Sequence, residues 1–314
     1  MLEKSVKTVI ETCLGLKPDE RLLIITDTAT DPVIGDSLLK YAHRRSNDAV
    51  LLTMKERDYN GEEPPDLVKA AMLEADAIIA PTKRSLTHTD ARINACKRGA
   101  RIISMPGITA EMFGSGGMMA DYIELDRMIR SVKPLFEDAR EVRVRSTAGC
   151  DLILDVTDCE WQVDSGICRE PGIGVNLPAG ELFVAPRGAD GIAIIDGTVA
   201  GLEEEDTLLE VEIRERRAVS ITGRGSEKLK DLLDRAGDAA YNIAEFGIGM
   251  NPEARLIRNI LEDEKVMGTV HIAFGTSAAF GGDVNAGIHL DCIIRDPEIY
   301  LDGERWKWEM IDPC

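Results

Sequence analysis

Short apolar runs alternate with amphipathic segments through the first 135 residues, and this alternation limits the possible folds more than any other feature of the chain. The apolar runs span 22–26, 49–54, 77–81 and 101–105. Strand-like runs separated by helical segments are typical of a parallel sheet flanked by helices. Asp31 and Pro32 supply a cap and a first-position proline for the helix after the first run. We predict an open, doubly wound α/β domain over residues 1–135.

The pattern changes near residue 135 and becomes strand-like. Apolar and polar residues alternate over 142–144, 152–156 and 192–195. Asp196-Gly197 and Asp302-Gly303 are typical of hairpin turns between strands, and the acidic run 203–206 predicts a solvated loop. One helical segment interrupts the strands after residue 225. We predict a second domain over residues 136–314, mixed α+β and largely antiparallel.

The charge balance and the cysteines exclude several classes of partner. The chain has 37 Lys and Arg residues against 56 Asp and Glu, which gives a net charge of −19. Nucleic acids and anionic membranes require a basic surface, and no apolar run reaches the roughly 18 residues that cross a bilayer. The amino terminus is amphipathic, unlike a signal peptide, and the seven cysteines contain no Cys-x-x-Cys pair. We expect a cytoplasmic protein with reduced thiols that binds neither nucleic acid nor membrane.

Two of the four histidines lie close together near the carboxyl terminus, at His271 and His289. His289 and Asp291 are two residues apart, and on a strand they project to the same face. Two imidazoles and a carboxylate form a candidate first shell for a divalent metal. A buried histidine satisfied by a neighbouring carboxylate is the simpler interpretation of either histidine alone, but the set together favours a metal site.

Two glutamates extend this candidate site. Glu181 follows a turn rich in Pro and Gly, and Glu245 lies among small and apolar residues, where a charged side chain is seldom buried without a partner. Three carboxylates and two imidazoles exceed what a structural zinc ion needs. They predict a catalytic site with one or two divalent ions, such as zinc, cobalt, manganese or magnesium.

The first domain contributes one candidate, His88. It follows the apolar run that ends at Pro81, and loops at the carboxyl ends of parallel strands are where open α/β sheets bind ligands. Arg92, one helical turn further, would assist with an anionic group. The alternative is that Thr87 or Thr89 caps a helix and that His88 is merely exposed.

Four segments that carry the second-domain residues resemble, in the same order, the metal-ligand segments of the thermophilic metallo-aminopeptidases of peptidase family M29. The segments are Asn-Leu-Pro-Ala-Gly-Glu-Leu-Phe-Val-Ala-Pro (176–186), Ala-Glu-Phe-Gly-Ile-Gly (244–249), Val-His-Ile-Ala-Phe-Gly (270–275) and Ile-His-Leu-Asp (288–291). Members of that family release N-terminal residues from peptides as dimers and hold two metal ions at these points. The resemblance therefore implies a two-metal centre with five ligands: Glu181, Glu245, His271, His289 and Asp291.

One position departs from the peptidase pattern. The peptidases carry a tyrosine seven residues after the histidine of the third segment, and this chain has Ala278 there. The chain is also shorter than peptidases of that type. Both features bring it nearer to a related branch that includes the 2,5-dihydroxypyridine 5,6-dioxygenases. That branch uses one non-haem iron held by two histidines and an aspartate, which implies His271, His289 and Asp291.

The first expectation is a metal-dependent hydrolase that resembles the M29 aminopeptidases and acts on small peptides. Its metal ions would activate water, with Glu181 or Glu245 as general base. Ser277, Thr276 or His88 would be the donor in place of the missing tyrosine. One alternative is a mononuclear iron dioxygenase that cleaves a dihydroxypyridine-like ring, and the other is a non-catalytic metal-binding protein. The resemblance also implies a homodimer.

Overall fold

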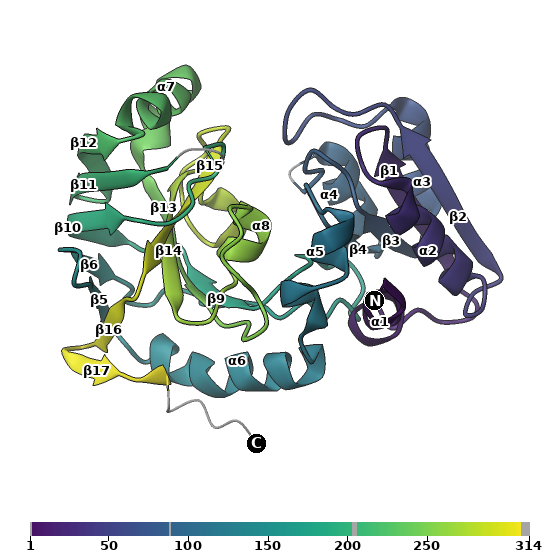
Figure 1. Cartoon of the computed structure of the whole chain (residues 1–314), viewed down its shortest axis with the longest axis horizontal. Helices are drawn as coiled ribbons and strands as arrows, with labels where there is room; N and C mark the ends of the chain where they lie inside the picture. Colours follow the sequence, from purple (N-terminus) through teal and green to yellow (C-terminus); the bar gives the residue numbers. More distant parts are fainter. Residues whose placement is uncertain (1, 88, 203–205, 309–314) are drawn as a thin grey trace. The chain divides into compact units, whose positions relative to one another are not determined.

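The computed structural model describes residues 2–87, 89–202 and 206–308, which form two compact units (Figure 1). One unit contains the residues up to 126 together with 164–179, and the other contains 127–163 and the residues from 180 onward. The single predicted boundary after residue 135 misses the return of the chain to the first unit over 164–179. This short segment adds one strand to the first sheet and has no strand–helix pattern that the sequence could reveal. His88 and residues 203–205 of the predicted acidic loop lie outside the described residues.

The first unit is a parallel sheet with flanking helices, as the alternation predicts, and its strand order is β2-β1-β3-β4-β8. Its strands are β1 (Arg21–Asp27), β2 (Asp48–Met54), β3 (Ala77–Ala80), β4 (Arg101–Ser104) and β8 (Gly174–Asn176). Its helices are α1 (Leu2–Lys7), a π-helical turn at Thr8–Cys13, α2 (Pro32–Ala42), α3 (Asp66–Glu74), α4 (Asp90–Lys97), α5 (Ala110–Phe113), a 3-10 turn at Gly116–Met119 and the start of α6 (Tyr122–Glu137). The Asp31 side chain accepts a hydrogen bond from the Val33 amide at 3.0 Å, so the predicted cap of α2 is confirmed.

One apolar core of this unit is formed by strands of the sheet together with α3 and α4. It includes Ile25 of β1, Met72 of α3, Ile78 of β3, Ala95 of α4 and Ile102 of β4, all buried. Every residue of β3 and β4 is buried. Parallel strands covered on both faces are nearly continuous apolar runs, and this explains why β3 is apolar throughout and why only the two end residues of β4, Arg101 and Ser104, are polar.

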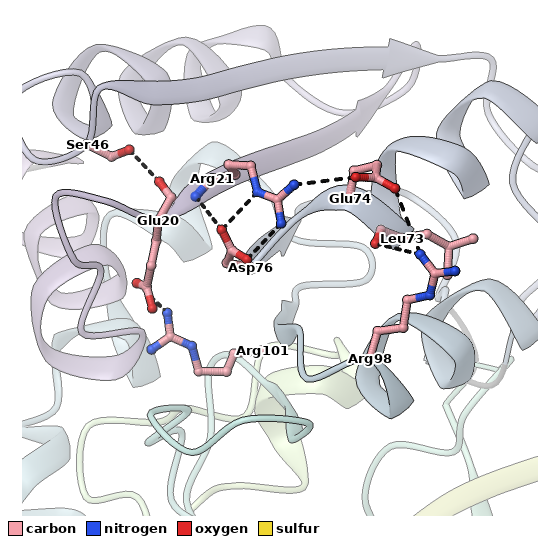
Figure 2. A network of polar contacts seen from close by, with 8 residues as sticks. All are labelled: Glu20, Arg21, Ser46, Leu73, Glu74, Asp76, Arg98 and Arg101. Atoms are coloured by element: carbon pink, nitrogen blue, oxygen red, sulfur yellow. Dashed lines mark hydrogen bonds and ion pairs between the residues drawn. The ribbon is translucent and has the colours of Figure 1, made fainter.

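A polar network connects the amino-terminal ends of the strands (Figure 2). Arg21 opens β1 and donates from Nε and Nη2 to the Asp76 carboxylate, each at 3.0 Å, and these hydrogen bonds lower the pKa of Asp76. Arg101 opens β4 and contacts Glu20 at 2.6 Å. Exposed ion pairs contribute little in water. The Arg101–Glu20 pair is the better shielded of the two, because the Arg101 side chain is only 4% exposed.

The second unit contains two sheets, and nearly all of its strand pairs are antiparallel, as the strand-like pattern predicts. The seven-stranded sheet has the order β12-β11-β10-β6-β5-β16-β17, and the five-stranded sheet has the order β15-β14-β13-β9-β7. The strands are β5 (Glu141–Arg145), β6 (Asp151–Asp155), β7 (Gln162–Asp164), β9 (Glu181–Val184), β10 (Gly188–Ile195), β11 (Leu208–Arg214), β12 (Arg217–Arg224), β13 (Ile243–Gly249), β14 (Thr269–Gly275), β15 (His289–Arg295), β16 (Glu298–Leu301) and β17 (Glu304–Trp306). The helical elements are the rest of α6, α7 (Ser226–Ala236), α8 (Ile260–Asp263) and 3-10 turns at Asp238–Tyr241 and Ala278–Phe280.

The two predicted hairpin turns have different outcomes. Asp302 and Gly303 join β16 to β17, and both have the positive φ, 48° and 86°, that a tight two-residue hairpin requires. Asp196 and Gly197 do not form such a turn, because twelve residues separate the paired strands β10 and β11. Asp196 instead accepts a hydrogen bond from the Arg295 amide at 2.8 Å.

The described helices include none that is long and apolar enough to cross a bilayer. The six cysteines of the described residues are free thiols. Burial raises the pKa of Cys168 to about 12, so this thiol stays protonated and unreactive near neutral pH.

Candidate metal centre

The five-stranded sheet of the second unit has one polar and one apolar face. Its register pairs Gly249 with Glu181, Gly247 with His271, Ala273 with Asp291 and Gly275 with His289. Paired residues of neighbouring strands project to the same face. The predicted site residues therefore share one face with small residues between them. The alternate positions form the opposite face and are buried and apolar: Leu182, Phe246, Ile248, Ile272 and Phe274.

The structure brings together all five side chains that the sequence predicts as metal ligands. His271 Nε2 lies 3.3 Å from Glu245 Oε1 and 3.5 Å from Glu181 Oε2. His289 Nε2 lies 3.4 Å from Glu245 Oε2 and 3.3 Å from Asp291 Oδ1. Glu245 thus contacts both imidazoles and lies between them.

These contacts form two overlapping groups that share Glu245. The first is Glu181, Glu245 and His271, and the second is Glu245, His289 and Asp291; within each, one ligand atom per residue lies within 4.8 Å of the others. The first group is closed, since its side chains are at most 8% exposed. The second group is more open, because the side chains of His289 and Asp291 are 19% and 16% exposed. The side of His289 and Asp291 is therefore the less covered side of the site.

Two glycines of β13 make room for the site. A Cβ atom at Gly247 would lie 2.1 Å from His271 Nε2, so the imidazole occupies the space that any larger residue would fill. A Cβ atom at Gly249 would lie 2.2 Å from the Val266 carbonyl oxygen, so the chain around residue 265 passes directly over the sheet there. Glycine is needed at both positions because other groups approach the strand closely there, and neither residue has a positive φ.

The backbone sets the orientation of His289. Its Nδ1 lies 2.9 Å from the Thr276 carbonyl oxygen, which only accepts hydrogen bonds, so Nδ1 carries the proton. In the neutral ring the lone pair is then on Nε2, which faces the carboxylates, as in most histidines that bind metals. The ring of Phe280 packs edge-on against the imidazole with centroids 5.6 Å apart.

The carboxylates change the protonation of both histidines. Burial lowers the pKa of His271, but the hydrogen bond with Glu245 and the charges of Glu181 and Asp291 outweigh it and raise the pKa to about 9. Burial also lowers the pKa of His289, and Asp291 and Glu245 raise it well above its usual value. These clustered carboxylates favour positive charge between them, which is the environment that a divalent cation requires.

Lys265 belongs to the site and was not predicted from the sequence. Its side chain is 1% exposed, and its Nζ lies 2.5 Å from Glu181 Oε1 and 2.7 Å from Glu264 Oε1. Burial raises the pKa of Glu181, and the Lys265 charge offsets part of that effect. The run Glu262-Asp263-Glu264-Lys265 has the composition of a solvated helix end, so only its burial reveals its role.

The candidates of the first unit are less informative. His88 lies outside the described residues. Thr89 caps α4 by accepting a hydrogen bond from the Arg92 amide at 3.2 Å, which is the alternative that the sequence left open. The Arg92 guanidinium lies 3.4 Å from the Gly174 carbonyl oxygen, so part of its hydrogen-bonding capacity is used within the unit.

The residues present fit a divalent cation. Glu181 Oε2 is one of the buried side-chain atoms of the described residues that have no hydrogen-bond partner, and it faces His271 Nε2 at 3.5 Å inside the group. Buried polar atoms are otherwise almost always paired. Imidazole nitrogen and carboxylate oxygen are suitable ligands for iron, zinc and manganese, and no cysteine belongs to either group.

Comparison with known proteins decides the family. The family model described as 2,5-dihydroxypyridine 5,6-dioxygenase (NicX) matches residues 2–307. The chain belongs to this family. It is 26% identical over 258 residues to the 2,5-dihydroxypyridine 5,6-dioxygenase of Pseudomonas putida KT2440, a match that covers 76% of this chain and 71% of the relative.

Two solved structures share the fold. The 2,5-dihydroxypyridine dioxygenase from Pseudomonas putida KT2440 superposes with a TM-score of 0.82 at 20% identity, over 97% of this chain and 94% of that one. Wild-type AmpT from Thermus thermophilus gives a TM-score of 0.71 at 17% identity, over 97% and 96%. The predicted relation to the M29 peptidases and their dioxygenase branch is confirmed.

The expectation of a hydrolytic aminopeptidase is wrong. The family model and the curated relative both describe a dioxygenase, and likeness to the peptidase at 17% identity shows the fold alone. The general-base role of Glu181 or Glu245 in peptide hydrolysis is withdrawn with it. The protein is an enzyme by its family, and one fold can support different reactions.

Proposed function

We propose that this protein is a ring-cleaving dioxygenase that uses one non-haem iron and acts on a dihydroxypyridine-like substrate. The family match over residues 2–307 is the observation that carries the proposal. Two imidazoles with adjacent carboxylates support it, because two histidines and one carboxylate with open positions are typical of non-haem iron oxygenases.

The proposed ligands are His271, His289 and Asp291, and Glu245 is a further carboxylate beside them. Glu245 is the carboxylate that contacts both imidazoles, and Asp291 lies on the more open side. Iron(II), when bound, supplies the one-electron chemistry that lets dioxygen react with an electron-rich aromatic ring. Glu181, which the sequence also predicts as a ligand, is paired with Lys265 on the closed side.

Other residues orient His289 and place aromatic rings beside it. The Thr276 carbonyl holds the proton on His289 Nδ1 and keeps Nε2 available. Phe280 packs edge-on against His289 and against Phe183, with centroids 5.6 Å apart in both pairs. Aromatic rings beside the open side favour a flat aromatic substrate. The homodimer remains a prediction.

Oxygen uptake tests the proposal. Metal-free protein is loaded with iron(II) without oxygen, mixed with 2,5-dihydroxypyridine and then exposed to oxygen, while uptake and loss of the ring absorbance are followed. We expect one oxygen molecule consumed for each ring cleaved, and no uptake in the His289→Ala variant. The absence of uptake with iron-loaded protein on this and related dihydroxylated rings would refute the proposal.

A further inference from the structure

The closed side of the metal centre already contains a cation. The Lys265 ammonium is buried and contacts Glu181 Oε1 at 2.5 Å and Glu264 Oε1 at 2.7 Å. An isolated buried charge is very costly, and a buried ammonium persists only with hydrogen-bonded partners of opposite charge. Both partners here are carboxylates, and one of them belongs to the Glu181–Glu245–His271 group.

The fold positions this ammonium through the backbone. Asn251 is fully buried, and its main-chain N–H donates a hydrogen bond to the main-chain carbonyl oxygen of Lys265 at 2.8 Å. Gly249 lies opposite Glu181 in the sheet, and its missing side chain lets residues 264–266 lie against the strand. Lys265 is therefore held over Glu181 by main-chain contacts and not by its own long side chain alone.

The number of carboxylates makes this position consequential. Two groups that share one carboxylate have the composition of a two-metal site, in which ions about 3.5–4 Å apart are bridged by such a ligand. The ammonium takes one oxygen of Glu181, and the other lies 3.5 Å from His271 Nε2. One of the two carboxylates of the closed group thus has its charge and one of its ligand atoms committed.

We propose that Lys265 is a positioning residue that serves as the internal cation of the closed group, so that the centre takes one divalent ion instead of two. The ion binds at the open group with His271, and Lys265 neutralises Glu181, where a second ion would otherwise bind. The inference rests on the proposed function, because a single iron is its premise, and it adds the residue that sets the metal number. Lys265 touches neither substrate nor oxygen in this role.

Metal counting tests the inference without any reaction. Metal-free wild-type protein and the Lys265→Met variant are saturated with manganese(II) alone and desalted, and bound metal per chain is measured together with the manganese electron paramagnetic resonance spectrum. We expect one ion and a mononuclear spectrum for the wild type. We expect two ions and a spin-coupled spectrum for Lys265→Met, because Glu181, freed of the ammonium, can then hold a second ion with His271 while Glu245, His289 and Asp291 keep the first.

The matched control is Glu264→Gln. Glu264 contacts the same ammonium but belongs to neither ligand group, so this variant should still bind one ion. Lys265→Met leaves two buried carboxylates without their cation, so the double variant Lys265→Met/Glu264→Gln is measured as well and should also bind two. Two ions in the wild type, or one ion in both Lys265 variants, overturns the inference. If Lys265→Met binds two ions and the wild type binds one, but the iron-loaded wild type takes up no oxygen, the proposed function is refuted and the role of Lys265 stands.

Discussion

Gly247 offers the sharpest test of how the metal centre is built. A Cβ atom at this position would lie 2.1 Å from His271 Nε2, whereas real Cβ contacts below 3.0 Å essentially never occur. In Gly247→Ala the imidazole must therefore move by at least 0.9 Å, from 2.1 to 3.0 Å. The ring is fully buried and the neighbouring strand positions are filled, so the displacement takes Nε2 away from Glu245 and Glu181.

The magnitude follows from the displacement. Misplacing a site group by about 1 Å costs on the order of 100-fold, and disturbing the support of a metal ligand costs roughly 10–100-fold in affinity. We expect Gly247→Ala to weaken manganese(II) or iron(II) binding about 10–100-fold, which is about 1.4–2.7 kcal/mol, as measured by competition with a chelator. Gly114→Ala is the control, because the nearest atoms there are 3.4 Å away and its φ is not positive. Wild-type metal affinity in a folded Gly247→Ala variant would refute the reasoning.

Three further predictions follow from the same contacts. His289→Ala should lose bound metal and oxygen uptake, while its circular dichroism spectrum shows an intact fold. The control His43→Ala, at the end of α2, should change neither metal content nor uptake. Full metal content in His289→Ala would contradict the ligand assignment. Phe246→Ala should lower the free energy of unfolding by about 3–5 kcal/mol in denaturant titrations. Phe246 is fully buried on the apolar face and packs edge-on against Trp161, with ring centroids 6.2 Å apart. A loss under about 1 kcal/mol would show that this face is not tightly packed. Metal affinity should rise with pH up to about 9, because the pKa of His271 is raised to about 9 and the ring must lose its proton to bind an ion. A metal affinity that stays constant between pH 6 and pH 9 would show that binding displaces no proton. The same raised pKa stabilises the metal-free fold below pH 6.5, and this contribution should disappear as the pH rises through 9.

The reaction was harder to predict from the sequence than the family. The four ligand segments are ordered as in the peptidases, and the fold is shared with one of them. Fold and donor set alone do not decide between water activation and oxygen chemistry. The departure at Ala278 pointed to the dioxygenase branch, but one missing donor carried less weight than four matching segments. The family match over nearly the whole chain overturned the hydrolase expectation, and the proposed dioxygenase reaction rests on it.

The local features of the fold were predictable from the sequence because they depend on neighbouring residues. The period of the apolar residues distinguishes strands from helices, and it predicted the parallel sheet of the first unit and the antiparallel strands of the second. The positions of His289 and Asp291 on one face follow from the alternation of side chains along a strand. The tight turn at Asp302 and Gly303 follows from residues that tolerate positive φ.

Only the tertiary structure determined how distant segments meet. Lys265 and Glu181 are 84 positions apart, and the charged run that contains Lys265 has the composition of a solvated surface. Its burial depends on Gly249 and on the close passage of residues 264–266, which no local pattern records. The place of Glu245 between two histidines likewise depends on strand pairing. The sequence alone therefore determined which chemical groups are present and which faces they share, whereas tertiary packing determined which charges neutralise one another, because burial and distance set the strength of an electrostatic contact.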